Sequence, residues 1–265
     1  MNYETAQKAF IKAIESKAYE FQAWELFSDF CKLSAISLYQ PFLRSEELES
    51  EYMQTISKYK KDMVAVFPKL LAYVVMGLED KMGDFLGECF MQLNLGSKYK
   101  GQFFTPYHLS SFMALILGNP IKKKESMVEP CCGSGGMVIA RADAISRDYG
   151  LEYQNMMEVQ ATDIDILCVH MSFIQLSLLG ISAEVVHGNS LSLEVFARWY
   201  TPKYIMNASN QQDNPTRKEK KVEELIHQTK QKKEKKKITL PCDTIKNKLL
   251  YSKEELEVFS TGQLF

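Results

Sequence analysis

A glycine-rich turn is the stretch of this sequence whose residues are best suited to bind a ligand. It reads Met127-Val-Glu-Pro-Cys-Cys-Gly-Ser-Gly-Gly-Met137 and joins a short apolar run to a run with helical spacing. Gly133, Gly135 and Gly136 favour positive φ and let a ligand approach the backbone closely. The first turn of a helix has N–H groups without partners, which attract a phosphate or a carboxylate. The turn therefore predicts a site for a negatively charged group.

Two common phosphate-binding patterns do not fit this turn. The glycines do not follow the Gly-x-Gly-x-x-Gly spacing of dinucleotide-binding folds, and no Gly-Lys-Ser/Thr follows them as in a P-loop. The ligand must therefore be recognised by additional groups elsewhere in the chain.

An acidic side chain stands at the end of the next predicted strand. Residues Met157–Asp163 read as this strand, and the chain continues to Asp165 through Ile164. An ionised carboxylate only accepts hydrogen bonds, so it suits the two hydroxyls of a ribose at the tip of a second strand. Asp163 and Asp165 are the candidates for that role, and Asp165 also suits the N-cap of the helix predicted over Ile166–Leu179.

The third predicted strand, Ile181–Val186, ends in His187-Gly-Asn-Ser-Leu191. Asn189 can bond a ligand at this strand end, although Gly-Asn by itself is also an ordinary turn. We interpret His187 as a strand-end residue without catalytic function. The four histidines show no metal-ligand spacing, so the sequence predicts no metal site.

The glycine turn and a segment upstream of it together resemble motifs of a known family. The acid-Pro-x-x-Gly-x-Gly-Gly pattern that starts at Glu129 closely resembles motif I of the S-adenosylmethionine-dependent N6-adenine DNA methyltransferases, above all the modification subunits of type I restriction systems. Upstream, Gly101-Gln-Phe-Phe-Thr-Pro106 resembles motif X of the same enzymes, in the order found where motif X comes first. The resemblance covers about residues 80–210.

The resemblance implies an α/β, Rossmann-like methyltransferase fold, with a mainly parallel sheet covered on both faces by helices. It also implies S-adenosylmethionine as the cofactor. Phe104 and Thr105 would cover its methionine end, Asp163 would hold its ribose, and Asn189 would bond its adenine ring. The implied cofactor-binding residues are Phe104, Thr105, Glu129, Gly133, Gly135, Asp163 and Asn189.

The catalytic loop of that family is degenerate here. Adenine N6 methylation uses an Asn/Asp-Pro-Pro-Phe/Tyr loop after the fourth strand, in which the aromatic ring stacks on the flipped base. No Pro-Pro occurs in this chain. We predict a fourth strand over Tyr204–Met206, which places Asn207-Ala-Ser-Asn210 where the loop belongs. Asn207 is therefore a conditional catalytic candidate, whereas Asn210 cannot replace an aromatic ring.

The chain as a whole suits one α/β domain with an added helical segment. It has 265 residues, 46% of them hydrophobic, which is ample for a core. Residues 1–95 form the predicted helical segment, and 96–265 the methyltransferase-like domain. The expected helices are one from Ser45 to Tyr59 with Ser45 as N-cap, one after Pro68, one from Asp80 to Leu93, and one from Tyr107 that Thr105 caps.

Charge is unevenly distributed along the sequence. The whole chain has a net charge of −1, but residues 214–237 hold ten Lys/Arg and four Glu. This run is either a solvated helix or flexible insert, or an arm that contacts DNA phosphates in a salt-sensitive way. A short strand at Ile238–Leu240 and a last helical turn at Lys253–Phe259 are also expected.

The composition argues against several other protein classes. No stretch reaches the roughly 18 continuous apolar residues of a membrane span, and the start of the sequence is unlike a signal peptide. The six cysteines lack CxxC pairs, so we expect a reduced, cytoplasmic protein.

Three functions remain open from the sequence. The first is an adenine-N6 DNA methyltransferase, active or degenerate, that works with restriction-modification subunits. The second is a catalytically inactive regulatory protein of a restriction-modification or mobile-element system, which binds cofactor, DNA or a partner. The third is methylation of a different nucleophile, such as a protein or a small molecule.

Overall fold

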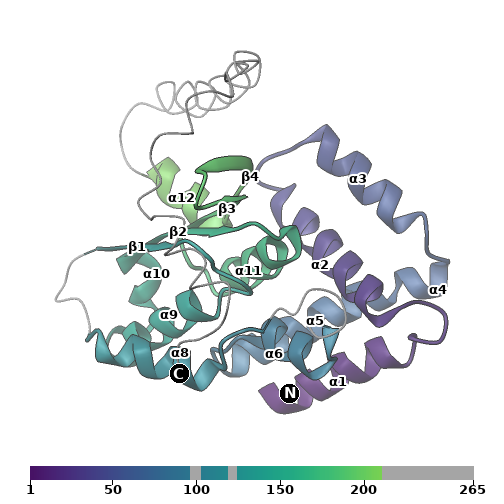
Figure 1. The fold of residues 1–265 in the computed structure, drawn as a ribbon, viewed down its shortest axis with the longest axis horizontal. Coiled ribbons are helices and arrows are strands. Elements are labelled where there is room, and N and C mark those ends of the chain that lie inside the picture. Colours follow the sequence, from purple (N-terminus) through teal and green to yellow (C-terminus); the bar gives the residue numbers. More distant parts are fainter. Residues whose placement is uncertain (96–102, 119–123, 211–265) are drawn as a thin grey trace, which may run out of the picture. The chain divides into compact units, whose positions relative to one another are not determined.

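The computed structural model describes residues 1–95, 103–118 and 124–210, which lie within one compact unit that runs to residue 211 (Figure 1). The predicted charged run at 214–237, the strand at 238–240 and the helical turn at 253–259 lie outside the described residues.

The N-terminal part is helical, as predicted. Its helices are α1 (Tyr3–Glu15), α2 (Ala23–Tyr39), α3 (Glu46–Ile56), α4 (Lys61–Val64), α5 (Val66–Asp80) and α6 (Phe85–Gln92). Ser45 caps α3, since its side chain accepts a hydrogen bond from the Leu48 N–H, which confirms the predicted cap. The helix predicted over Asp80–Leu93 is wrong at its start: α5 ends at Asp80, and α6 begins after an N-cap at Asp84.

Aromatic rings fill the centre of these helices. Phe10 of α1 contacts Phe27, Phe30 and Phe85 at centroid distances of 6.1, 5.2 and 5.8 Å, all edge to face. The same hydrophobic cluster continues without a break through α11 to Trp199. The helical segment is therefore packed onto the sheet region through a shared core.

The sheet contains four strands among the described residues, in the order β1-β2-β3-β4. Strands β1 (Glu125–Glu129), β2 (Met157–Asp163) and β3 (Ala183–Asn189) are parallel, and β4 (Glu194–Tyr200) runs antiparallel to β3. The predicted second strand has the observed bounds. The third begins two residues later than predicted, and it extends to Asn189.

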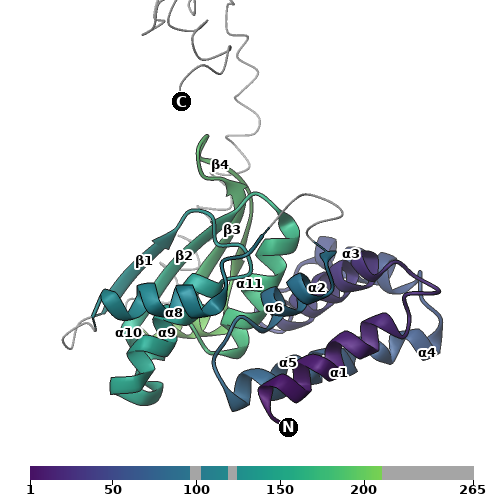
Figure 2. The ribbon, with the colours of Figure 1, turned by 60° about the horizontal axis from the view of Figure 1, so that its bottom comes forward.

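Helices cover both faces of this sheet (Figure 2). On one side lie α8 (Tyr107–Ile116), α9 (Gly136–Tyr149) and α10 (Tyr153–Met156), with the 3-10 turn η1 (Gly150–Glu152) between the last two. On the other side α11 (Ile166–Leu178) lies between the sheet and α2. Gly180 follows α11 with φ +67°, the left-handed conformation in which glycine commonly ends a helix. The predicted α/β fold is thus observed.

The predicted fourth strand is wrong. Tyr204–Met206 lies inside α12 (Pro202–Asn210), and the fourth strand of the structure is β4, which precedes that helix. Thr201 fixes the start of α12, because its N–H donates to the Ala183 carbonyl and its hydroxyl donates to the Ile181 carbonyl. The chain therefore turns at Thr201 to enter a helix.

Candidate cofactor site

The glycine turn after β1 has the backbone geometry that the sequence predicts at two of its three positions. Gly133 has φ +55° and Gly135 has φ +95°, values that favour glycine strongly. Gly135 is the N-cap of α9 and provides no side-chain cap, so N–H groups of the first helical turn remain available to a ligand. The expectation of a positive φ at Gly136 is wrong, because Gly136 is the first residue of α9.

Asp163 links this turn to the end of β2. One oxygen of its carboxylate, Oδ2, accepts the Gly133 N–H at 2.9 Å, and the other, Oδ1, accepts the Asp165 N–H at 2.9 Å. Each oxygen has a second lone pair, so the half-buried carboxylate can still accept two more hydrogen bonds. Asp165 itself accepts the Leu167 N–H and caps α11, as its alternative interpretation predicts.

The loops after β1 and β3 meet Asp163 at the same edge of the sheet. Glu129, the last residue of β1, accepts the Cys131 N–H at 3.2 Å. The Cys131 thiol lies 4.0 Å from the Ser190 hydroxyl, which follows Asn189. The side-chain oxygen of Asn189 accepts the N–H groups of Leu191 and Ser192, so its amide nitrogen is the group left for a ligand among the described residues.

Phe104 covers the glycine turn from the side of α6. Two of its ring carbons lie 3.0 and 3.1 Å from the point where a Gly133 side chain would begin, and its ring packs on Phe90 at 5.1 Å. Thr105 is exposed beside it. The predicted N-cap function of Thr105 is wrong: Pro106 stands at the N-cap position of α8, and no side chain caps this helix.

A buried aspartate that the sequence interpretation missed holds the turn from behind. Asp84 accepts hydrogen bonds from the Ser134 hydroxyl at 2.5 Å, from the Gln175 amide at 2.9 Å and from the Gly87 N–H at 3.0 Å. Gln175 also donates to the Ser134 carbonyl and accepts the Leu86 N–H. Burial raises the pKa of Asp84, and the hydrogen bonds from Gln175, Ser134 and Gly87 oppose that rise.

Ile164 is a second residue that the sequence interpretation missed. It follows Asp163 directly, is 62% exposed, and its carbonyl lies 3.2 Å from the His187 ring nitrogen Nε2. An exposed apolar side chain at the edge of a binding crevice suits the flat face of an aromatic ligand. The available signal was its position between two aspartates at a strand end.

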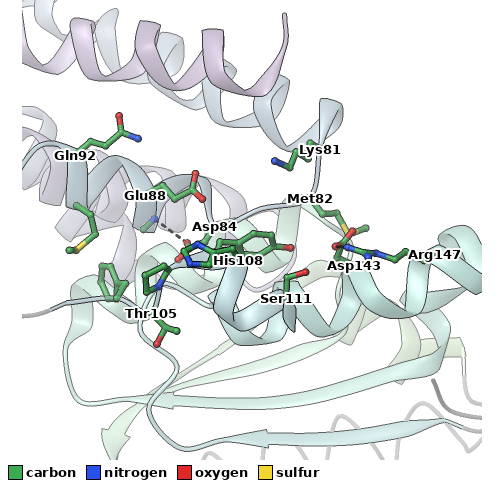
Figure 3. A pocket seen from close by; sticks show the side chains of 15 residues that line it. Lys81, Met82, Asp84, Glu88, Gln92, Thr105, His108, Ser111, Asp143 and Arg147 are labelled. Atoms are coloured by element: carbon green, nitrogen blue, oxygen red, sulfur yellow. Dashed lines mark hydrogen bonds and ion pairs between the residues drawn. The ribbon is translucent and has the colours of Figure 1, made fainter. Parts of the chain in front are cut away.

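A pocket of about 630 Å³ borders the site and shares Phe104 and Thr105 with it (Figure 3). Its wall combines positive and negative side chains from α6, α8, α9 and the loop before α6, among them Lys81, Glu88, Asp143 and Arg147. Gly133, Asp163 and Asn189 do not line it. The groups that the sequence singles out therefore lie at the strand ends, outside this pocket, except Phe104 and Thr105, which line it.

The described residues contain no fourth parallel strand that would place Asn207 at this edge of the sheet. Strand β4 runs back from the Asn189 end of β3, and Tyr200 pairs with Glu184 near the opposite end. Helix α12 starts at that opposite end, where Lys203 donates to Asn155 just before β2. The premise that placed Asn207 in a loop after a parallel strand is therefore wrong.

Other kinds of site receive no support from the described residues. In the parts of the chain that the structure describes, no group of three or more His, Cys, Asp and Glu side chains could hold a metal ion. Within those same ranges no helix is long and apolar enough to cross a membrane. No disulfide joins the five cysteines of these ranges, which are Cys31, Cys89, Cys131, Cys132 and Cys168.

Comparison with known proteins identifies a family. The profile of the family described as N-6 DNA Methylase matches residues 78–242, which is more than half of the chain. No curated protein matches.

Two solved structures are also similar to this chain. One is a protein from Listeria monocytogenes described as a putative class I S-adenosylmethionine-dependent methyltransferase. It is 17% identical to this chain with a TM-score of 0.42, and the match covers 71% of this chain and 54% of that one. The other, a methyltransferase subunit of a type I restriction-modification system from Streptococcus thermophilus, is 15% identical with a TM-score of 0.33, covering 67% and 55%. The chain thus spans little more than half the length of either protein.

Proposed function

We propose that the space between the glycine turn, Asp163 and Asn189 holds S-adenosylmethionine. This is the cofactor of the N-6 DNA methylase family, to which the chain belongs. The observation that carries the proposal is the Asp163 carboxylate. Both of its oxygens are fixed by backbone N–H groups, and both keep a lone pair for the two hydroxyls of a ribose.

The two ends of the cofactor would bind on either side of Asp163. The methionine carboxylate suits the uncapped N-terminus of α9 at Gly135, and its ammonium group suits the Glu129 carboxylate. Phe104 and Thr105 would cover this end. The adenine ring suits the exposed Ile164 side chain, and the Asn189 amide can donate to a ring nitrogen.

Bound in this way, S-adenosylmethionine would supply a methyl group on a positively charged sulfur, and an acceptor nitrogen such as adenine N6 would exchange a proton for it. The residues at Gly135, Asp163 and Asn189 would contribute by holding that group in a fixed position relative to its acceptor. A polar-Pro-Pro-aromatic loop that would position N6 is absent from this sequence.

We therefore favour a cofactor-binding methylase whose reaction depends on additional groups. Asn207 stays a conditional catalytic candidate.

DNA is the proposed macromolecular substrate, and residues 214–237 are the proposed phosphate-contacting arm. Restriction-modification subunits are the proposed partners. A location in the cytoplasm is also proposed, since the described cysteines are not joined by disulfides. We also propose residues 1–95 as a helical segment that supports a methyltransferase-like part from 96 onward.

The alternative is an inactive regulatory relative that binds cofactor and transfers nothing. The missing Pro-Pro loop favours this alternative, whereas the preserved geometry at Gly133 and Asp163 favours a working cofactor site.

Calorimetric titration of the full chain with S-adenosylmethionine tests the cofactor site, and we expect saturable 1:1 binding. Absence of heat and of any thermal stabilisation would contradict it. Transfer of a tritiated methyl group to unmethylated DNA then distinguishes the alternatives: label on adenine identifies an enzyme, and cofactor binding without label identifies the regulatory relative.

A further inference from the structure

Asp84 lies between the first turns of two helices that belong to different parts of the chain. It is the N-cap of α6 in the helical segment, and it is 2% exposed. A side chain at Gly87, in the first turn of α6, would overlap the Asp84 carboxylate and the Ser134 hydroxyl. A side chain at Gly136, the first residue of α9, would begin 3.0 Å from the same carboxylate. Glycine at both positions lets α6 approach the start of α9 this closely.

Ser134 is held through both its side chain and its main chain. Its hydroxyl donates to Oδ2 of Asp84, and its carbonyl accepts the side-chain amide of Gln175 on α11. The same amide donates to Oδ1 of Asp84 at 2.9 Å. Ser134 stands between Gly133 and Gly135, the two residues of the turn with positive φ. The segment that joins these glycines is therefore fixed from the buried side of the turn.

These bonds determine which way the backbone of the turn faces. Because a peptide group is planar and trans, the direction of the Ser134 carbonyl sets the direction of the Gly135 N–H. That N–H donates to the Cys132 carbonyl at 2.8 Å, inside the turn. Ser134 itself is 2% exposed, so its side chain lies behind the surface that the cofactor would meet. Asp84 thus reaches the cofactor site through the turn.

We propose that Asp84 is a positioning residue for S-adenosylmethionine: it orients the glycine turn through Ser134, so the helical segment is part of the working cofactor site. The inference rests on the proposed function of this site. What matters is the position of the carboxyl group and not its charge. An asparagine has nearly the same shape. Its Oδ1 can accept the Gly87 N–H and the Gln175 amide, and its amide can donate to the Ser134 hydroxyl, which accepts as well as donates.

Matched substitutions separate positioning of the turn from general support of the fold. Asp84→Ala removes the three hydrogen bonds of the carboxylate, and Ser134→Ala removes only the one to the turn. Asp29→Ala is the control. Asp29 is also a buried aspartate of the helical segment, but its bonds from Lys58 and Tyr59 stay within that segment. A residue that only supports the fold changes stability and leaves the affinity of the folded protein unchanged.

Calorimetric titration of the full chain with S-adenosylmethionine measures each affinity, at a temperature where thermal unfolding shows that the variant is folded. Asp84→Ala and Ser134→Ala should each weaken binding about tenfold, and the double variant should lose no more than about twofold beyond either, because both act through one bond. Asp84→Asn and Asp29→Ala should stay within about threefold of the parent. Normal affinity in Ser134→Ala, or a loss of about tenfold in Asp84→Asn or Asp29→Ala, would overturn the proposal, even if Asp84→Ala does not fold.

Amide hydrogen exchange tests the positioning without the cofactor. The N–H groups of Gly133 and Gly135 are hydrogen-bonded at the turn, and that of Val159 is hydrogen-bonded in β2. In Ser134→Ala the two turn amides should exchange several times faster than in the parent, while exchange at Val159 stays unchanged. If the full chain binds no S-adenosylmethionine, the proposed function fails, whereas faster exchange at the turn still supports its positioning by Asp84. Unchanged exchange at the turn would overturn the inference even where the cofactor binds.

Discussion

The carboxylate of Asp163 accepts a hydrogen bond from the backbone N–H of Gly133 at 2.9 Å, although the two residues are 30 positions apart in the sequence. This bond fixes the turn after β1 against the end of β2. It therefore aligns the groups proposed for the methionine end of the cofactor with the group proposed for its ribose.

Replacing Asp163 with alanine should weaken binding of S-adenosylmethionine by roughly a hundredfold or more. Two hydrogen bonds from ribose to a charged acceptor are lost, and bonds of this type contribute about 1.5–3 kcal/mol each, net of exchange with water. Calorimetry measures the change. Glu158→Gln, at the second residue of the same strand, where Glu158 pairs with Lys124, is the matched control and should bind normally. Unchanged affinity in Asp163→Ala would remove this residue from the site.

Gly135→Ala should destabilise the protein more than Gly118→Ala. Both glycines have positive φ, which costs a side-chain-bearing residue about 1–2 kcal/mol. At Gly135 a new Cβ would also lie 3.0 Å from the Ser172 hydroxyl and 3.4 Å from the Ser172 Cα, whereas the Gly118 position is open. Urea unfolding should show a loss of about 2–4 kcal/mol at Gly135 and about 1–2 kcal/mol at Gly118. Equal losses would mean that crowding at Ser172 is relieved without cost.

Gln175→Met should destabilise the fold by about 2–4 kcal/mol, because it removes one of the three hydrogen bonds to the buried Asp84 carboxylate and takes the side-chain partner from the Leu86 N–H and the Ser134 carbonyl. Gln160→Met is the control. Gln160 is exposed and donates to Glu184, so its replacement should change stability by less than about 0.5 kcal/mol. Chemical unfolding of the two variants gives both values, and similar values would show that the buried network contributes little.

His170 should make the protein less stable as the pH falls below 6.5. Burial lowers its pKa to about 3, and its ring lies 5.2 Å from Trp199. The folded state therefore holds a neutral His170 while the unfolded state takes up a proton, so stability is fully present above pH 6.5 and declines between pH 6.5 and 3. The slope approaches about 1.4 kcal/mol per pH unit.

The variant His170→Gln isolates this contribution, because the carboxylates titrate alike in both proteins. Unfolding free energies at pH 7 and pH 5 should differ by about 1–2 kcal/mol less in the variant than in the parent. An identical pH dependence would show that His170 is already protonated in the folded protein.

Local patterns in the sequence predicted the elements that carry the proposed cofactor site. Three glycines before a helical run and an aspartate at the end of an apolar strand are short-range signals, and Gly133, Gly135 and Asp163 adopt the geometry that those signals require. Each signal depends on neighbours within a few residues, so no tertiary contact was needed to interpret it.

The fourth strand and the buried network depend on distant contacts, and there the sequence was insufficient. Strand β4 exposes Phe196, Ala197 and Arg198 in succession, so its sequence lacks the alternation of buried and exposed residues that predicts a strand. Tyr204–Met206 has an apolar pattern that is typical of a short strand, although it lies in a helix. Asp84 resembles an ordinary helix cap, because its partners Ser134 and Gln175 lie 50 and 91 residues away.

The most direct test of the cofactor site is a crystal structure of the full chain with S-adenosylmethionine bound. The proposal predicts both ribose hydroxyls within hydrogen-bonding distance of the Asp163 carboxylate and the methionine carboxylate at the start of α9. A cofactor seated elsewhere, such as in the pocket between α6 and α9, or an Asp163 carboxylate without contact to the ribose, would contradict it.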